Sequence, residues 1–278
     1  MNSSTQIQNP LFSIVIVNFN HGQFIEEAIN SVICQNCQDF ELIIIDGGST
    51  DKSVDIIKKY QHKLSWWVSE RDNGQSDAFN KGFKNAKGQF YFWLNADDYL
   101  LPNSLEHAKN SINKNPNCIW FTANTIFFSE TGIVKKCSRG PQWRNFLLKN
   151  GPIYVYGPTS IFHRSIFELV GDFDQNLNYS MDTELWLRFK NKGISFIRIS
   201  RYFWGFRIHE DSKTSHTLVS SPSINYIKEQ EYISKKHNVS ITRKGKILQF
   251  LYKVLFGCYL FSLIDTLVYK GRNINKLK

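Results

Sequence analysis

The chain has 278 residues, of which 42% are hydrophobic and 15% aromatic, and its formal net charge is +10. This composition excludes a wholly disordered chain and allows one large or two small domains. The positive charge agrees with an anionic small substrate, a membrane surface or nucleic acid, and by itself does not choose among them.

The cysteines and the N-terminal residues indicate the cellular compartment of the protein. The five cysteines are odd in number, and a chain of this length needs no disulfides to hold a core, so we expect reduced thiols. Cys34 and Cys37 form a single CxxC pair without further ligands at suitable spacing, which disfavours zinc. Residues 1–10 are polar, lack the apolar segment of a signal peptide and are predicted to be flexible. We therefore expect a cytoplasmic protein.

Strand and helix patterns alternate along the first hundred residues. The strands are apolar runs rich in β-branched or aromatic residues, and the helices have apolar residues at helical spacing. In chain order they are a strand at 11–20, a helix at 22–35, a strand at 40–51 that closes in an acidic glycine-rich loop, a helix at 53–60, a strand at 64–70, a helix at 75–88 that stops at Gly88, and a strand at 89–95. This order predicts an α/β fold with a mostly parallel sheet flanked by helices.

Polar clusters follow all four of these strands. In FYFWLNADDYLLPNS, at 90–104, a core strand runs straight into acids. The clusters are Asn18–Asn20, Asp46–Asp51, Glu70–Asn73 and Asn95–Asp98. Each alone is typical of a solvated turn, because Asn and Asp favour turns. Parallel sheets bind ligands outside the carboxyl ends of their strands, so four clusters at one edge predict a site.

The rest of the chain gives mixed patterns up to residue 215. We expect a strand at 117–128, a strand followed by a helix and a turn within 156–174, a helix at 181–193 with Gly193 as its stop, a strand at 194–200 and a polar loop at 207–215.

The C-terminal segment 244–272 has a different character. It is rich in Leu, Phe and Tyr and has Lys and Arg at both ends. Its longest uncharged run, Val254 to Ile264, is too short to span a bilayer. The pattern predicts a pair of amphipathic helices that lie in a membrane interface, pack on the core, or form a dimer interface.

Several stretches resemble one known family. SIVIVNFNHGQFIEEAINSV, LIIIDGGSTD, SERDNGQSDAFNKGF and GQFYFWLNADD are similar, in this order, to motifs of the inverting nucleotide-sugar glycosyltransferases of family 2, which have the GT-A fold. GPTSIFHRSIFELVGDFDQNLNYSMDTELWLRF and RIHEDSKTS fit the acceptor half of the same group. The resemblance implies a GT-A domain at 11–215, divided near residue 104 into a nucleotide-binding half and an acceptor half, and a helical, basic extension at 216–278.

The resemblance also implies the residues of a donor site and a catalytic base. Phe19 matches the ring that stacks on the base of the nucleotide, and Asp46 the acid at the edge of that base. Asp182 matches the general base that takes the proton of the acceptor hydroxyl, although its position also suits a helix cap, and Glu184 is the neighbouring candidate. The implied nucleotide-sugar residues are Asn18, Phe19, Asn20, Asp46, Arg71, Asp72, Asp77, Asn80, Asn95 and Asp97.

A divalent cation completes the implied site. A cation held by carboxylates neutralises a diphosphate leaving group, and oxygen ligands suit Mn²⁺ or Mg²⁺. The resemblance makes Asp97 and His209 metal ligands, with Asn95 in the place of the commoner first Asp of the DxD site. An amide there brings no charge, which predicts weaker metal binding. Asp98, Arg207 and Lys213 are supporting residues, and the last two suit phosphates.

The leading hypothesis is an inverting glycosyltransferase that moves a sugar, most simply from a UDP-sugar, to a saccharide or lipid-linked acceptor. Resemblance to bacterial members implies lipopolysaccharide, O-antigen or capsule assembly by a peripheral protein at the inner face of the plasma membrane. A sugar-phosphate nucleotidyltransferase would need a glycine-rich phosphate loop where NFNHGQF stands. A non-catalytic binding protein is the third class, and the scattered basic residues disfavour nucleic acid as its partner.

Overall fold

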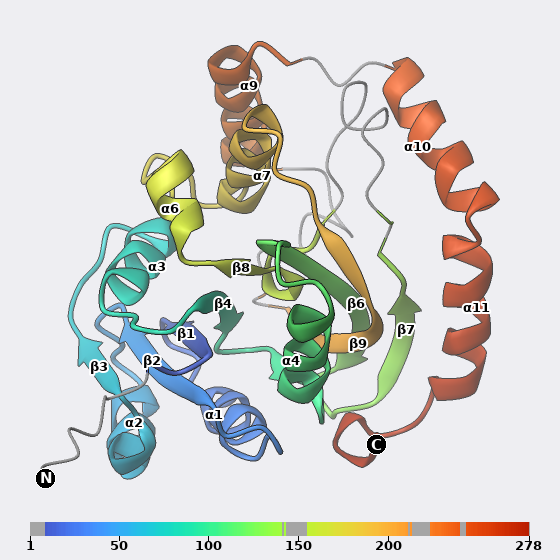
Figure 1. The fold of residues 1–278 in the computed structure, drawn as a ribbon. Coiled ribbons are helices and arrows are strands. Elements are labelled where there is room, and N and C mark those ends of the chain that lie inside the picture. Colours follow the sequence, from blue (N-terminus) through green and yellow to red (C-terminus); the bar gives the residue numbers. More distant parts are fainter. Residues whose placement is uncertain are drawn as a thin grey trace, which may run out of the picture.

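The computed structural model describes residues 9–140, 142, 155–210, 212, 223–239 and 243–277. These residues form one central sheet with helices on both of its faces (Figure 1). Within them the sheet has nine strands, in the order β3-β2-β1-β4-β8-β6-β9-β5, and β7 pairs with β6. The strands are β1 (Phe12–Asn18), β2 (Phe40–Asp46), β3 (Trp66–Ser69), β4 (Phe90–Asn95), β5 (Tyr99–Leu100), β6 (Trp120–Ser129), β7 (Val134–Ser138), β8 (Ile161–His163) and β9 (Ile197–Ile208). The α-helices are α1 (Ile25–Ile33), α2 (Ser53–Tyr60), α3 (Gln75–Lys84), α4 (Ser104–Lys114), α6 (Ser165–Val170), α7 (Met181–Asn191), α9 (Ile224–His237), α10 (Arg243–Leu255) and α11 (Cys258–Tyr269).

The strands β3, β2, β1 and β4 run parallel, and their register brings their carboxyl ends together. Asn18 at the end of β1 pairs with Asp46 at the end of β2, which pairs with Ser69 at the end of β3. On the other side of β1, Val17 pairs with Asn95, the last residue of β4. The four polar clusters therefore follow strands that end at one edge of the sheet, as the alternation of strands and helices predicted.

The other half of the sheet is mixed. β8 is antiparallel to β4 and β6, β5 is antiparallel to β9, and β6 is parallel to β9. β9 extends to Ile208, well beyond the strand predicted at 194–200, so Arg207 lies in a strand and not in the predicted loop 207–215. Residues 203–207 are buried in β9 because the strand pairs with distant β6, with shifts of register that local sequence does not reveal.

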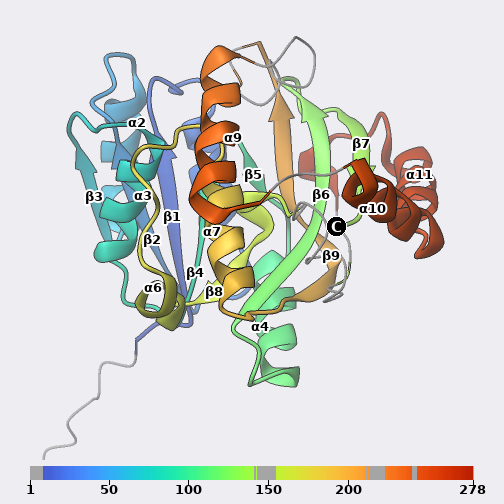
Figure 2. The same cartoon turned by 90° about the horizontal axis from the view of Figure 1, so that it is seen from above.

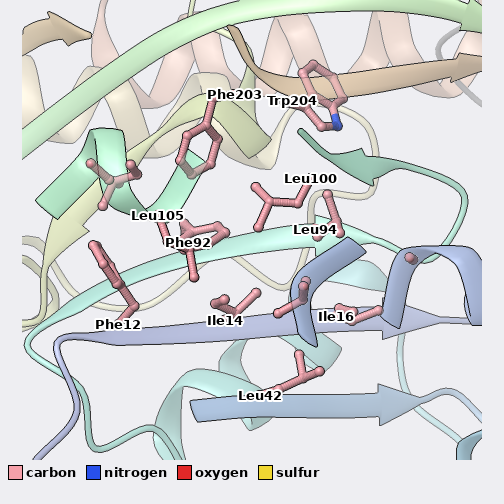
Figure 3. Packing of buried hydrophobic residues seen from close by; sticks show 14 of the residues in the cluster. Phe12, Ile14, Ile16, Leu42, Phe92, Leu94, Leu100, Leu105, Phe203 and Trp204 are labelled. Atoms are coloured by element: carbon pink, nitrogen blue, oxygen red, sulfur yellow. The ribbon is translucent and has the colours of Figure 1, made fainter. Parts of the chain in front are cut away.

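Alternate residues of β1 point into two hydrophobic clusters, one on each face of the sheet. Phe12, Ile14 and Ile16 pack with residues of α1, α2 and α4, and Figure 3 shows them among side chains of neighbouring strands. Val15 and Val17 pack with residues of α3, α6 and α7. A parallel strand that is covered on both faces reads as a continuous apolar run, which is the pattern of β1 and β2.

The predicted helices are present, with some different ends. α2 has the predicted bounds, whereas α3 ends at Lys84, before the predicted stop at Gly88. Gly88 lies against β1, where a methyl group would come within 2.5 Å of Ser13 Oγ. Gly193 follows α7 with a φ of 71°, as predicted. The sequence patterns do not predict α4 or β7, whereas α9 lies within the helical extension expected at 216–278.

The C-terminal helices lie in two places (Figures 1 and 2). α9 lies beside α7, and its Ile233 belongs to the cluster of Val15 and Val17. α10 and α11 run along the margin of the molecule next to β7, on the side away from β3. This confirms the predicted pair of helices within 244–272. No helix of the described residues is long and apolar enough to cross a bilayer.

Candidate active site

The ends of β1, β2 and β3 are joined by one buried carboxylate. Asp46 is fully buried, and its Oδ1 accepts hydrogen bonds from Asn18 Nδ2 at 2.6 Å and Ser49 Oγ at 2.6 Å. Its Oδ2 accepts from the Ser49 backbone N–H at 2.9 Å and from Ser69 Oγ at 2.6 Å. Both carboxylate oxygens of Asp46 thus hold the loops after β1 and β2 and the end of β3. To contact the edge of a nucleotide base, as predicted, Asp46 would have to give up one of these hydrogen bonds.

The loop after β1 presents an aromatic ring to solvent. Phe19 is 61% exposed, which is unusual for so large an apolar side chain next to a core strand. A methyl group at Gly47 would lie 3.4 Å from the Phe19 ring and 2.6 Å from Asp72 Oδ2, so the ring and this acid both lie close to the same glycine. An exposed ring beside a carboxylate is a suitable platform for a base or a sugar.

Asn20 fixes the conformation of this loop. Its φ of 53° lies in the left-handed region, which Asn tolerates better than most residues. Its backbone N–H donates to Ser49 Oγ at 2.8 Å, and its Oδ1 accepts from the Thr50 backbone N–H at 2.8 Å. Asn18 and Asn20 therefore connect the loops after β1 and β2.

The loop after β3 places a second set of predicted residues. Arg71 is exposed, and Asp72 Oδ1 accepts from the Gly74 backbone N–H at 2.9 Å. Asp77 accepts from the Asn73 backbone N–H at 3.0 Å. Asp72 and Asp77 thus shape the turn into α3 and leave Arg71 facing solvent at its start.

Asn80 differs from the prediction that it lines the donor site. Its Nδ2 donates to the Phe173 carbonyl at 2.9 Å, and its Oδ1 accepts from the Phe173 backbone N–H at 2.8 Å. Both ends of the amide are therefore used to fasten α3 to the segment before α7. The resemblance that implied Asn80 as a donor-site residue did not reveal this hydrogen-bond partner.

The amide of Asn95 is turned toward its neighbours. Asn95 Oδ1 accepts from Gln75 Nε2 at 2.9 Å, and Asn95 Nδ2 donates to Asp98 Oδ2 at 2.9 Å. Asp98 Oδ1 accepts from the Arg207 backbone N–H at 3.1 Å. Burial and the adjacent charge of Asp97 raise the pKa of Asp98 well above its usual value. Asn95 and Asp98 thus connect β4, α3 and β9.

Asp97 lies with two histidines in an arrangement that fits a divalent cation. Asp97 Oδ2 is 2.9 Å from His209 Nε2, and one ligand atom each of His21, Asp97 and His209 lie within 4.8 Å of one another. Among the described residues, the buried Nδ1 of His209 has no hydrogen-bond partner. A buried polar atom without a partner costs free energy unless something else satisfies it. One carboxylate and two imidazoles form a familiar donor set for transition metals.

His21 is the residue of this cluster that sequence reasoning missed. It directly follows the predicted cluster Asn18–Asn20, in the loop after β1, and this position was the available signal. Its ring lies 5.9 Å from the His209 ring, and the Phe24 ring lies 4.9 Å from His209 on another side. The two histidines come together because the carboxyl end of β9 lies next to this loop, which local patterns do not show.

Arg207 is buried, so the prediction that it pairs with phosphate does not agree with the structure. Its Nε donates to the Asp97 carbonyl at 2.8 Å, another nitrogen donates to the Glu130 carbonyl, and Nη2 pairs with Glu27. The guanidinium also lies over the rings of Phe24 and Phe128. Arg207 therefore holds the backbone of Asp97 in place. Lys213 lies outside the described residues.

Asp182 is the second residue of α7 and lies near β4. Its Oδ1 accepts from the Thr183 backbone N–H at 2.6 Å. A methyl group at Gly157 would lie 3.1 Å from Asp182 Oδ2 and 2.4 Å from the ring of Trp93, a residue of β4. Burial raises the pKa of Asp182 to about 6. The backbone N–H groups of Thr183 and Gly157 both hydrogen-bond to this carboxylate, and a pKa near neutral suits the side chain for proton transfer.

Glu184, the alternative candidate for the base, is occupied by ion pairs. It is fully buried and lies 2.8 Å from Arg188 Nη2, 2.9 Å from Lys236 Nζ and 2.9 Å from His237 Nε2. Burial alone would raise its pKa, but the hydrogen bonds and charges of these partners lower it. The structure therefore makes Glu184 a link between α7 and α9 and leaves Asp182 as the candidate base.

A second carboxylate of α9 shapes the segment before Asp182. Glu229 Oε1 accepts from the Asn178 backbone N–H at 2.7 Å, and Oε2 accepts from those of Tyr179 and Ser180, both at 3.0 Å. Three backbone donors converge on this single buried side chain. Sequence reasoning gave no role to Glu229, because nothing near it in the chain points to residues 178–180.

The sequence matches the model of glycosyl transferase family 2 over residues 13–171. The chain belongs to this family. It is accordingly a glycosyltransferase, which favours the transferase hypothesis over the nucleotidyltransferase and the non-catalytic binding protein. The chain is similar to an uncharacterized glycosyltransferase of Rickettsia typhi, which is 27% identical over 86% of this chain and 75% of its own length. The poly(ribitol-phosphate) β-N-acetylglucosaminyltransferase TarS of Staphylococcus aureus is 25% identical over 56% of this chain and 28% of its own length.

Solved structures confirm the predicted GT-A fold. The fragment 1–349 of S. aureus TarS in complex with UDP-GlcNAc has a TM-score of 0.61 at 18% identity, over 80% of this chain and 65% of that one. A mannosyltransferase of Pyrobaculum calidifontis in complex with GDP-Man and Mn²⁺ has a TM-score of 0.57 at 12% identity, over 93% and 88% of the two chains.

Proposed function

We propose that this family 2 member is an inverting glycosyltransferase that takes a sugar from a nucleotide diphosphate, with UDP as the first candidate, and transfers it to a hydroxyl group. The observation that carries the proposal is the convergence of Phe19, Asp72, Asp97 and His209 on the loops at one edge of the sheet, with Asp182 beside β4. The complexes of TarS with UDP-GlcNAc and of the mannosyltransferase with GDP-Man support a nucleotide-sugar donor.

The loops after β1, β2 and β3 would bind the nucleotide. Phe19 offers its exposed face for stacking on the base, and Asp72 lies beside it over Gly47 to accept hydrogen bonds. Arg71 is exposed at the start of its loop, where a guanidinium suits a phosphate. Asn18, Asn20 and Asp46 hold these loops in one arrangement, so that less order has to be gained when the donor binds.

His21, Asp97 and His209 would hold a divalent cation, and Mn²⁺ fits this set better than Mg²⁺, which prefers oxygen ligands. Bound there, such an ion would supply positive charge next to the diphosphate of the donor. The Mn²⁺ in the P. calidifontis mannosyltransferase supports this proposal. Asn95, whose amide is bonded to Gln75 and Asp98, is not among the proposed ligands.

Asp182 would act as the general base. Its carboxylate accepts the proton of the acceptor hydroxyl while the hydroxyl oxygen forms a bond to the anomeric carbon. The bond from that carbon to the nucleoside diphosphate breaks at the same time, and the diphosphate leaves with the electron pair. Attack from the side opposite to the leaving group inverts the configuration. This mechanism needs no second nucleophilic carboxylate, in agreement with the ion pairs that occupy Glu184.

The proposed acceptor is a saccharide or a lipid-linked saccharide in bacterial lipopolysaccharide, O-antigen or capsule assembly. The resemblance of the sequence to bacterial members of the family and the apolar C-terminal helices with their basic residues support this acceptor. They also support a peripheral protein at the inner face of the plasma membrane.

The test is a transfer assay with a panel of nucleotide sugars and Mn²⁺. We expect donor hydrolysis or transfer by the natural chain, and a loss of at least 100-fold in Asp97→Asn and in Asp182→Asn. Asp55→Asn is the matched control, because Asp55 is an exposed acid on α2. Full activity in both site variants would refute the mechanism.

A further inference from the structure

The helix α11 has the opposite orientation from most surface helices, because its polar side chains face the sheet and its apolar side chains face outward. Its polar residues face the sheet: Ser262 Oγ accepts from the Arg139 backbone N–H at 2.8 Å, and Thr266 Oγ1 accepts from that of Cys137 at 2.9 Å. Asp265 pairs with the Arg139 side chain. Surface helices normally place their apolar stripe toward the core and their polar residues toward water.

The outward side of α11 is apolar, and α10, whose Phe250 ring lies 5.7 Å from the Tyr259 ring of α11, adds further exposed apolar residues. On α11 the exposed fractions are 58% for Leu260, 57% for Leu263 and 74% for Leu267. On α10, Phe250, Leu251 and Leu255 are 56%, 47% and 80% exposed. We call these six residues the outer face. A continuous exposed surface of large apolar side chains marks a site of contact with a membrane or a protein.

The charges beside the outer face indicate what covers it. Asp265 is the only acidic residue in 243–278, and it is already paired with Arg139. Exposed basic side chains lie on the adjacent strand β7 and in the segment after α11, which is hydrogen-bonded to the start of β7: Lys135, Lys136, Lys270, Arg272 and Lys276. We call these basic residues the basic rim. In a dimer formed through the outer face, the basic rims of the two copies would repel each other, whereas the negative charge of an anionic bilayer would attract the rim.

We propose that α10 and α11 lie flat in the interface of an anionic lipid bilayer, with the outer face among the acyl chains and the basic rim at the headgroups. Neither helix is long and apolar enough to cross the bilayer. Both expose apolar residues as interfacial helices do, and a basic residue ends each segment, Lys253 in the last turn of α10 and Lys270 directly after α11. This inference rests on the proposed function, which places the protein at a membrane, and it adds which helices and which lipids make the contact. The binding itself does not require catalysis.

The test uses the full chain with vesicles of phosphatidylcholine alone or mixed with phosphatidylglycerol. We expect the chain to float with the mixed vesicles, less with the neutral ones, and less again at high salt. Leu255→Asp and Leu267→Asp should each weaken binding roughly tenfold or more, because each removes one buried leucine from the contact. Ile224→Asp is the matched control, since Ile224 is 71% exposed but lies on α9.

Three results would overturn the inference: no flotation with either vesicle, equal loss of binding in Ile224→Asp, or a dimer in analytical ultracentrifugation that Leu267→Asp dissociates. The last would assign the outer face to a second copy. Donor hydrolysis measured without vesicles separates this inference from the proposed function. Hydrolysis that persists in Leu255→Asp, which no longer binds vesicles, supports both proposals, whereas flotation without hydrolysis counts against the function alone.

Discussion

The carboxylate of Asp182 combines a crowded position with a hydrogen bond from the start of its own helix. One oxygen accepts from the Thr183 backbone N–H, and the other faces Gly157. Burial raises the pKa of the side chain to about 6, so near neutral pH it is mostly ionised yet basic enough to accept a proton. The N-cap residue of α7 is Ser180 and not Asp182, and the burial and raised pKa of Asp182 suit the proposed general base.

This pKa predicts the acidic limb of the pH profile. A base must be deprotonated to act, so kcat/KM should fall about tenfold per pH unit below pH 6 and level off above it. The profile should be measured with the metal at saturation. In Asp182→Asn the remaining activity should be low and lack this limb. A limb near pH 4 in the natural chain would contradict the assignment.

Phe19 gives a second prediction at this scale. Its ring is exposed, so removing it costs the fold little, while the base of the donor would lose its stacking partner. Phe19→Ala should raise the KM for the donor about tenfold and leave kcat little changed, and Phe19→Tyr should behave like the natural chain. Steady-state kinetics over a range of donor concentrations will show this. An unchanged KM in Phe19→Ala would mean that the base binds elsewhere.

At the scale of elements, α9 controls the segment that leads into α7. Glu229 binds three successive backbone N–H groups at Asn178, Tyr179 and Ser180, and Glu184 of α7 pairs with Lys236 and His237 of α9. The N-terminus of α7, and with it Asp182, is thus positioned by a helix that comes later in the chain.

Glu229→Gln should show this positioning. The new amide places a donor against backbone donors, so we expect kcat to fall about tenfold at an unchanged KM for the donor, with a lower melting temperature. Glu231→Gln, an exposed acid on the same helix, is the control. Glu229→Asp keeps the charge and should recover part of kcat. A fall in melting temperature with no change in kcat would reduce Glu229 to a structural role.

At the scale of the whole molecule, the sheet collects loops that are far apart in the chain. The parallel strands bring the loops after β1, β2 and β3 to one edge, and β9 adds His209 next to them. A ligand that binds across these loops contacts several elements at once and binds only the folded state. It should therefore stabilise the chain by linkage.

A thermal-shift screen will measure this linkage. With Mn²⁺ present, a nucleoside diphosphate at about a hundredfold excess over its Kd adds roughly 2.7 kcal/mol, which corresponds to a rise of several degrees in melting temperature. We expect one base to be preferred, with UDP as the first candidate, and the shift to shrink in Asp97→Asn. Stabilisation by none of the common nucleoside diphosphates, with or without metal, would count against a nucleotide-sugar donor.

Local patterns were sufficient for much of this architecture. Apolar runs and helical spacing located β1 to β4 and α1 to α3, because a strand covered on both faces and a helix with one covered face leave distinct periods in the sequence. The same reasoning gave the polar edge with Phe19 and Asp97. It did not give His21, Glu229 or the partner of Asn80, since their roles depend on contacts with segments far along the chain.

The sequence by itself determined the family, the α/β fold and the polar ends of the parallel strands, because these follow from local periods and from motifs in a fixed order. Only the tertiary structure decided that His21 joins Asp97 and His209, which lie 112 residues apart, and that Arg207 and Glu184 are buried in support of the site. The tertiary structure also decided that the apolar side of α11 faces outward. Burial and pairing across such distances are set by how elements pack, and no short stretch of sequence contains that information.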